Sequence, residues 1–570
     1  MLRTYREVNP SASILVLDKG SSIGGVWAQD RLYPGLKTNN HFGTFEFSGY
    51  PMSSEGFGPD DHIPGPHVHS YLHRYAEESG FLRYIWFNSS VQSAVDEGED
   101  GWTLTVIDEA SKEKSKRVIK ASRLVMATGI TSEPLVPNFI GAKEFHAPIY
   151  HTSEFARKSN GLGSYKNVVI LSGAKFSWDI ACAYASAGIK VDWVIRESGH
   201  GPCWMTPNRL TPLKIIPEAL LQTRLITWLS PCIWGEADGY ASIRNFFSQH
   251  WLGRKIVDGF FHKIEHSILE QNNYDGHPET AKLKPWDDVF FVGTNRGLLN
   301  YGLDFFGLVH SGMIRIHIAD ITHLTDHTVH LSTGEKLDAD ILVCGTGWKD
   351  TPPINFITSR DLGLPGHTSS TYAEYIPRAD REILEKCPKL QKQPPPKKIK
   401  PLSDSPTDIT GEPYRLYRFI VPPAFIETRT LAFAGTYRSP STTIIAQAQA
   451  LWITALFGGH IPSLSSSSGI SQATTGERSA DPQERILYET VLHSQFGKWR
   501  YSRGFGARFP ELWMDCVPYI DLMLRDVGVS FRRKGWWWKE WFEAYGPKDY
   551  EGIVQEFIEN KERNKQGEKR

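Results

Sequence analysis

The stretch SILVLDKGSSIGGVWAQDRLYPGLKTNN, residues 13–40, decides the fold that we expect for this chain. Its apolar run Ile14–Leu17 is typical of a buried strand and ends at Asp18, a carboxylate that can accept both hydroxyl protons of a cofactor ribose. A turn with the pair Gly24–Gly25 follows, and adjacent glycines let the backbone approach a flat or anionic ligand closely. The stretch therefore predicts the second strand and the following turn of a doubly wound, dinucleotide-binding domain.

The glycine-rich turn that such a domain needs is not found before Asp18. A turn of the form G-x-G-x-x-G is expected about 20 residues before the ribose acid. Only 17 residues precede Asp18, and none of them is glycine. Met1–Glu7 is typical of the end of the helix that follows such a turn. We therefore expect a first domain that is N-terminally incomplete, either because the gene model begins too late or because the chain is truly shortened.

A second dinucleotide unit is predicted from Asn167 onward. The run Val168–Leu171 predicts a strand, SGAKFSWDIACAYASAG predicts a turn and a helix, and Val191–Ile195 predicts the next strand. This spacing suits a β-α-β unit. Arg196 closes the second strand at the position of the ribose acid, where a cation favours the 2′-phosphate of NADP over NAD. The alternative is a solvated charge at the end of a strand.

The turn of this second unit departs from the glycine pattern. Ser172, Ala174 and Ser177 occupy the three glycine positions. A degenerate fingerprint is weak evidence alone, and here the flanking strand and helix support it.

Length and composition limit the classes of protein to consider. At 570 residues the chain is too long for one ordinary domain. Its formal charge of −1 and its apolar content of 40% fit a soluble globular protein and exclude a global attraction to nucleic acid. The six cysteines are scattered without a C-x-x-C pair, which predicts neither a metal site nor a dithiol redox centre.

We predict a cytoplasmic protein with at most peripheral membrane contact. No apolar run of 18 residues is present. The nearest one, Leu220–Gly235, is interrupted by Arg224 and Pro231, so we expect a buried or interfacial helix there. The sequence does not indicate an oligomeric state.

The fold class that we predict is α/β, with two Rossmann-like domains of parallel strands, a helical insertion and an aromatic-rich C-terminal extension. The predicted domains are the first part of domain one at 1–160, domain two at 161–350 with the insertion at about 200–300, the return to domain one at 351–460, and a linker with the C-terminal extension at 461–570.

Further elements are predicted from periodicity and turn residues. Strands are expected at Ile85–Val91, Trp102–Ile107, Ser122–Gly129 and Leu431–Gly435, and helices at Ser70–Gly80 and Thr442–Phe457. An exposed loop is expected at Glu382–Pro413, a mobile segment at Ser463–Gln483, surface-packed aromatic clusters at Trp499–Phe509 and Trp536–Phe542, and a frayed end at 559–570.

The order of these motifs resembles the flavin-containing monooxygenases, and more narrowly their fungal dimethylaniline-type branch, over Tyr5–Tyr550. The matching segments include LVLDKGSSIGGVW, YPGLKTNN, FHAPIYHTSEF, LVCGTGW and FAGTYRSPSTTIIAQAQALW. The third segment carries the family hallmark F-x-G-x-x-x-H-x-x-x-[YF]. Phe145, His151 and Phe155 keep its spacing, and Ala147 replaces its glycine.

The resemblance implies an enzyme that binds FAD in the first domain and NADPH in the second. In the family, NADPH reduces the flavin, oxygen adds to flavin C4a, and the hydroperoxide delivers one oxygen atom. The implied substrates are O2 and a small or medium apolar metabolite of secondary, polyketide-like metabolism.

The family's active-site asparagine matches Asn39 in the pair Thr38–Asn39, with Asn40 as its close rival, whereas a plain turn-forming asparagine is the alternative. The implied cofactor-binding residues are Asp18, Lys19, Gly24, Gly25, Trp27, Asn39, Val91, Thr128, Gly129, Ser172, Gly173, Lys175, Ser177, Arg196, Thr346 and Gly347.

Two other classes of function stay open at this point. The missing glycine turn is compatible with a non-catalytic relative that binds a partner or ligand. The two nucleotide units are also compatible with a disulfide or quinone reductase, although the lack of a C-x-x-C pair counts against the disulfide type.

Overall fold

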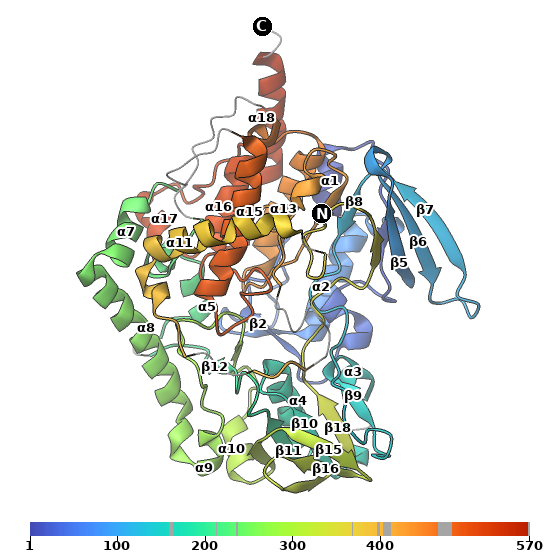
Figure 1. Ribbon diagram of the computed structural model, residues 1–570, viewed down its shortest axis with the longest axis vertical. Helices are drawn as coiled ribbons and strands as arrows, with labels where there is room; N and C mark the ends of the chain where they lie inside the picture. Colours follow the sequence, from blue (N-terminus) through green and yellow to red (C-terminus); the bar gives the residue numbers. More distant parts are fainter. Residues whose placement is uncertain are drawn as a thin grey trace.

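The computed structural model describes residues 1–158, 163–211, 214–234, 238–367, 369–395, 399–402, 412–465 and 481–567. A parallel sheet with its helices fills one end of the molecule, and a helical body with a mixed sheet at its side fills the other (Figure 1).

The parallel sheet confirms the second dinucleotide unit. Its five strands lie in the order β14-β11-β10-β18-β9 and pair in parallel. Their bounds are Ile314–Ile318 for β14, Lys190–Ile195 for β11, Asn167–Leu171 for β10, Ile341–Cys344 for β18 and Ile149–His151 for β9. The two predicted strands therefore lie within one residue of β10 and β11.

Both faces of this sheet are covered. Helix α4, Lys175–Ser186, places Trp178 against Trp193 of β11 and Phe305 of α10, Phe305–His310. The antiparallel strands β15, β16 and β17 cover the other face; they span Ile321–Thr325, Thr328–Leu331 and Lys336–Asp338. Burial on both faces explains why the central strands β10 and β18 consist almost entirely of apolar residues.

The first dinucleotide unit consists of two short parallel pairs. Strand β1, Val16–Leu17, pairs with β4, Ile85–Trp86, and β8, Leu124–Met126, pairs with β20, Leu431–Phe433. Among the described residues, these two pairs are not joined into one sheet. The first predicted strand was therefore too long, since only two of its residues form a ladder and Leu15 is 37% exposed.

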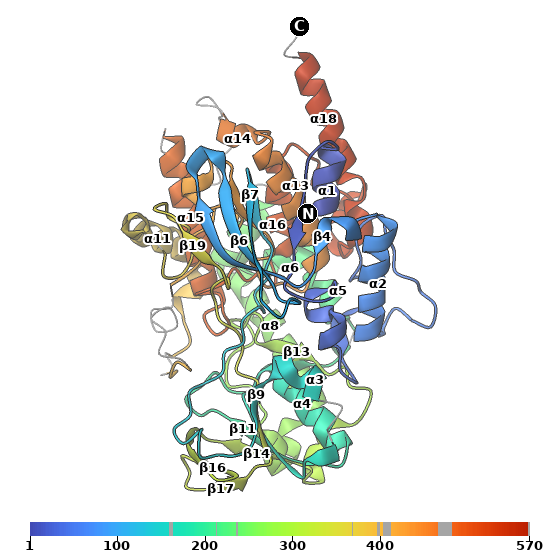
Figure 2. The ribbon, with the colours of Figure 1, turned by 90° about the vertical axis from the view of Figure 1, so that its right-hand side faces the viewer.

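A mixed sheet, in which β19 pairs in parallel and the other strands pair antiparallel, stands beside the first unit (Figure 2). It has the order β19-β5-β6-β7, with bounds Asn355–Ile357, Ser89–Asp96, Trp102–Asp108 and Lys116–Ala121. The predicted strand Ile85–Val91 is wrong as one element, because Asn88 turns the chain at φ 52° between β4 and β5. The predicted strand Trp102–Ile107 is confirmed as β6.

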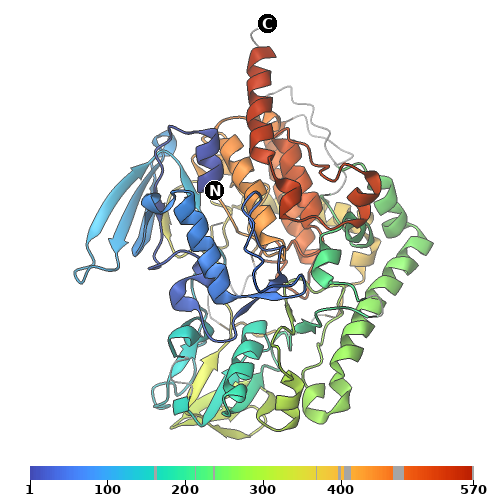
Figure 3. The ribbon, with the colours of Figure 1, turned by 180° about the vertical axis from the view of Figure 1, so that it is seen from behind.

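The helical body is built around α13, Thr442–Phe457, which has the predicted bounds and is buried along most of its length. Around it lie α16, Cys516–Asp526, α15, Pro482–Arg500, and α11, Ile376–Lys386. The N-terminal helix α1, Leu2–Val8, packs against α13 and against the C-terminal helix α18, Ile553–Gly567, whose end projects from the body (Figure 3).

The insertion predicted at about 200–300 is mainly helical. The parallel strands β12, Trp204–Thr206, and β13, Arg296–Leu298, form its base. Its helices are α5, Pro217–Leu221, α6, Arg224–Leu229, α7, Ala241–Gln249, α8, Trp251–Asn272, and α9, Pro278–Ala281.

The single helix predicted at Leu220–Gly235 is wrong. The chain breaks between α5 and α6, and Arg224 is fully buried at 0% exposure. Its guanidinium contacts Asp521 and lies 3.1 Å from a carboxylate oxygen of Glu540. The charge that seemed to interrupt an apolar run therefore ties the insertion to the C-terminal extension.

Other predicted boundaries are also corrected. The helix predicted at Ser70–Gly80 begins earlier, as α2, Gly65–Glu78, because Pro66 suits a first helical turn. The predicted loop Glu382–Pro413 begins inside α11, and its residues 396–398 and 403–411 lie outside the described residues. The expected frayed end is helical in α18, up to Gly567.

The remaining predictions for the C-terminal part have mixed outcomes. Most of the segment Ser463–Gln483 lies outside the described residues, which resume at Asp481 after the short helix α14, Pro462–Ser465. In the first aromatic cluster Tyr501 and Phe509 are buried. In the second, Trp536 and the outer face of α17, Trp537–Phe542, are exposed instead of packed.

Candidate active site

The segments that follow β1, β8 and β18 contact one another along one shared edge, at the carboxyl ends of these strands. After β1, the Lys19 ammonium donates to the Ser132 carbonyl at 3.3 Å and pairs with Glu133 at 3.1 Å. The loop that follows β8 then reaches the end of β18, where the Leu135 amide donates to the Gly347 carbonyl at 3.0 Å. Ligands of open α/β sheets bind at such carboxyl ends, so this shared edge is the candidate site.

The glycines at this edge leave space beside the backbone. Gly25, Gly129 and Gly347 have φ values of 60°, 67° and 85°, and no atom lies within 4 Å of the position of an added Cβ. Gly24 differs, because its φ is 121° and a Cβ would lie 2.9 Å from the Trp27 carbonyl carbon. The turn after β1 therefore requires glycine at 24 and offers an open backbone at 25.

The remaining residues predicted to bind the first cofactor lie nearby or in the adjoining sheet. Asp18 is partly buried and accepts a hydrogen bond from the Gly20 amide at 2.8 Å. Thr128 accepts one from the Ser132 hydroxyl through its carbonyl. The hydroxyl of Thr346 donates to the Leu135 carbonyl. Val91 lies in β5 at a bulge opposite Val106.

The two candidate asparagines lie on opposite faces of β2, Lys37–His41, which pairs with β3, His62–Pro64. Successive side chains of a strand point to opposite faces. Asn40 is partly buried, and its amide donates to Glu218 and to the Pro440 carbonyl at 2.8 Å. Asn39 is exposed. The structure therefore leaves the amide of Asn39 available to a ligand, whereas that of Asn40 is bound within the protein.

Glu218 of α5 is the residue that holds β2, and sequence reasoning missed it. This carboxylate is 5% exposed. It accepts from the His41 amide at 2.8 Å and the Thr44 hydroxyl at 2.7 Å, and the His41 ring nitrogen Nδ1 lies 3.2 Å away. The rings of His41 and His62 are 4.5 Å apart, and burial lowers the pKa of His62. An acid inside the apolar run IIPEALL was the only available signal.

The turn of the second unit has, at one serine, a backbone conformation that favours glycine. Ser172, at the first glycine position, has φ 122°, a region that is costly for residues with a side chain. A Cβ on Gly173 would lie 2.3 Å from the Gly201 carbonyl oxygen. Ser177 is fully buried in the first turn of α4, and its hydroxyl faces Gly345.

The two cations predicted to bind NADPH are engaged inside the protein. The Lys175 ammonium pairs with Asp179 and lies 3.2 Å from the Tyr301 hydroxyl. Arg196 donates to the Lys400 carbonyl at 2.7 Å and lies 3.6 Å from Asp320. Burial lowers the pKa of Arg196, and Asp320 opposes this effect. Contact of these cations with a nucleotide phosphate stays a prediction.

The hallmark histidine lies between the two units. His151 ends β9 and is buried, with its ring edge-on to Trp348 at 4.9 Å. Burial lowers the pKa of His151 to about 4, against a hydrogen bond with the Gly347 backbone that raises it. The imidazole is therefore neutral at neutral pH.

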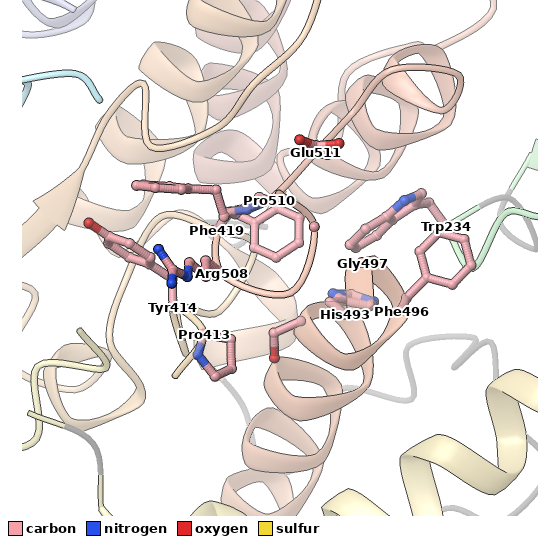
Figure 4. Close-up of a pocket in the computed structure, with 13 residues that line it drawn as sticks. Trp234, Pro413, Tyr414, Phe419, His493, Phe496, Gly497, Arg508, Pro510 and Glu511 are labelled. Atoms are coloured by element: carbon pink, nitrogen blue, oxygen red, sulfur yellow. The ribbon is translucent and has the colours of Figure 1, made fainter. Parts of the chain in front are cut away.

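A separate small cavity lies between α15 and the segment 505–511 (Figure 4). Trp234, Tyr414, His493 and Glu511 are among its lining residues, and its volume is about 10 Å³. This is room for one water molecule, so the cavity is not a substrate site.

Comparison with known proteins identifies the family. The profile of the flavin-binding monooxygenase-like family matches residues 15–231. The FAD-dependent monooxygenase resA of Aspergillus sclerotiorum is 32% identical over 98% of this chain and 96% of its own length. The FAD-dependent monooxygenase rstn6 of Aspergillus nomiae is 32% identical over 98% and 95%. The chain belongs to the FAD-dependent monooxygenases and is thus an oxidoreductase.

A solved structure shows the same fold. The cyclohexanone monooxygenase from Rhodococcus sp. Phi1 bound to NADP+ superposes with a TM-score of 0.52 at 16% identity, covering 80% of this chain and 82% of its own. This agrees with the predicted α/β fold of two Rossmann-like units. Within the described residues, no helix has both the length and the apolar character needed to cross a membrane.

The residues at this shared edge fit FAD in part. Asp18 at a strand end suits a ribose, and the open backbone at Gly25, Gly129 and Gly347 suits a flat ring. For the pyrophosphate, the described residues offer no glycine-rich turn next to β1. Family membership confirms the predicted monooxygenase class and FAD as its cofactor, and the individual binding residues stay predictions.

Proposed function

We propose that this chain uses FAD and NADPH to insert one oxygen atom of O2 into a small or medium apolar metabolite of secondary metabolism. The observation that carries the proposal is the free amide of Asn39 on a strand that is anchored on both sides. Strand β2 is fixed on one side by Asn300, which donates to the Thr38 carbonyl at 3.0 Å, and on the other by Pro440, which accepts from Asn40. Asn39 lies between these two anchors.

Support for NADPH comes from the second dinucleotide unit. Its parallel sheet is complete, its turn has the conformation of the glycine fingerprint, and Arg196 follows β11. The cyclohexanone monooxygenase that shares this fold binds NADP+. A cation at this position favours the 2′-phosphate that distinguishes NADPH from NADH.

The contribution of this chain is binding, orientation and exclusion of water. When bound, FAD supplies the activation of oxygen. Asp18 would accept the ribose hydroxyls, and the open glycines would receive the ring. The neutral amide of Asn39 would donate a hydrogen bond to the reacting oxygen without releasing a proton, so it would stabilise charge there and not quench it. The imidazole of His151 is neutral and would supply no proton to the reacting oxygen.

The experiment is product analysis with the purified protein. We expect bound flavin absorbance, NADPH-dependent oxygen uptake and an oxygenated product from a panel of apolar metabolites. Asn39→Ala is expected to lower product formation about 100-fold, the cost of removing one positioned donor. Asn564→Ala, an exposed asparagine of α18, is the matched control. A folded protein that oxidises NADPH only with a quinone and without oxygen would refute the proposal.

A further inference from the structure

The exposed face of α17 carries an unusual group of large aromatic side chains. Trp536, Trp537, Trp538 and Phe542 are exposed to 67%, 63%, 47% and 54%. We call these four residues the aromatic patch. Large apolar side chains that are exposed together on one short segment indicate a site of interaction.

The aromatic patch is presented by a firmly held helix. On the inner side of α17, Glu540 is buried beside Arg224 at 3.1 Å. The indole of Trp541 donates to the Tyr240 hydroxyl at 3.0 Å and lies against Trp228 with ring centroids 5.5 Å apart. Because the inner side chains are fixed, the outward position of the patch is part of the fold. Figure 1 and Figure 3 show α17 at the edge of the helical body, beside α7.

A basic groove adjoins the aromatic patch. Residues 528–532 and Arg525 line an open groove of about 430 Å³. Both guanidiniums of the groove, Arg525 and Arg532, lie beside the Phe531 ring, at 5.7 Å and 5.6 Å. The Tyr240 ring lies 5.7 Å from Arg532 and 6.3 Å from the inner residue Trp541, so it links the groove to the helix that bears the patch.

The charge of this groove is not neutralised locally. Among the described residues, neither Arg525 nor Arg532 forms an ion pair, and Arg532 donates only to the Asp238 carbonyl, at 3.1 Å. The neighbouring cations differ, because Arg533 pairs with Glu556 and Lys534 with Asp549. Two positive charges therefore remain available beside the aromatic patch.

This combination fits the surface of an anionic lipid bilayer. Indole rings concentrate at the level of the headgroups, where one side of the ring is apolar and the other is wet. Basic side chains within a Debye length of an anionic leaflet are attracted to it. We propose that the aromatic patch and the Arg525–Arg532 groove form a docking surface for an anionic membrane. The inference does not depend on the proposed substrate or cofactors.

The test is co-sedimentation of the full chain with lipid vesicles. One set contains phosphatidylcholine alone, and the other contains phosphatidylcholine and phosphatidylserine in equal parts. We expect the wild-type protein to sediment with the anionic vesicles, and to bind more weakly to the neutral ones and at high salt. Arg525→Gln and Arg532→Gln are each expected to lower the affinity for anionic vesicles about fivefold.

Substitution of the rings tests the apolar part. The triple variant Trp536→Ser/Trp537→Ser/Trp538→Ser is expected to bind anionic vesicles more than about tenfold more weakly. The double variant Trp536→Ser/Trp538→Ser keeps Trp537, whose ring centroid lies 4.7 Å from that of Trp541. It tests the apolar contribution to vesicle binding if the triple variant unfolds.

The matched control is Val118→Ser/Ile140→Ser, which removes two apolar side chains exposed to 68% and 76% on other elements. Three results would each overturn the inference. They are absence of wild-type binding to any vesicle, unchanged binding of both Trp variants, and a wild-type dimer that the Trp variants convert to a monomer in light scattering. The last result would assign the patch to contact between copies of the chain.

Discussion

Replacement of Glu218 by alanine tests how the insertion holds the strand that bears Asn39. Strand β2 pairs only with the short strand β3, with an irregular register, and an isolated two-stranded ribbon is marginal in water. Glu218→Ala leaves the His41 amide without its acceptor, and it removes one of two partners from the Asn40 amide and the Thr44 hydroxyl. A buried donor left unpaired costs about 1–3 kcal/mol. Because the hydrogen bonds of Asn40 and Thr44 are weakened as well, we expect a total loss of about 3 kcal/mol in the free energy of unfolding.

The assay is urea unfolding of wild type and variant, followed by circular dichroism. Glu218→Gln keeps one acceptor oxygen and is expected to lose less than Glu218→Ala. The matched control is Glu113→Ala, an exposed loop residue that is expected to change stability by less than about 0.5 kcal/mol. If Glu218→Ala lowered stability by no more than this control, the carboxylate would not be the anchor of β2 and our reasoning would fail.

Three further predictions concern stability. Ser172→Gly is expected to be about 1–2 kcal/mol more stable than Ser172→Ala in chemical denaturation, because both lose the hydroxyl and only glycine is relaxed at φ 122°; equal stabilities would contradict the strain. The pKa of His151 is about 4 in the folded chain and about 6.5 unfolded, so its contribution is present above about pH 6.5 and is lost as pH falls toward 4. Between pH 7 and pH 5 the free energy of unfolding of the wild type is therefore expected to fall by about 2 kcal/mol more than that of His151→Phe. The measurement is urea unfolding of both proteins at both pH values, and an equal fall for the two proteins would exclude this linkage. Arg224→Leu leaves Asp521 and Glu540 buried without their cation and is expected to lower the free energy of unfolding by about 3–5 kcal/mol. The loss is measured as a shift of the urea midpoint, and an unchanged midpoint would mean that this ion-pair network does not stabilise the fold.

The local sequence was sufficient to predict those strands and helices in which most residues are apolar. The strands β10 and β11 follow the predicted runs within one residue, and α13 has its predicted ends. Apolar residues make up most of these segments, because most of their positions are buried whatever their exact partners. The turn after β1 was also predictable from the sequence, because the backbone around Gly24 leaves no space for a side chain.

The tertiary structure alone decided what each polar residue does. Asn40 and Glu218 are 178 positions apart, and Arg224 and Glu540 are 316 apart. No local pattern indicates such pairs, so Arg224 was interpreted as an interruption of an apolar run and Asn40 as a close rival of Asn39. The exposure of Trp536 and its neighbours was hidden for the same reason: whether an aromatic run is core or surface depends on which distant segment covers it.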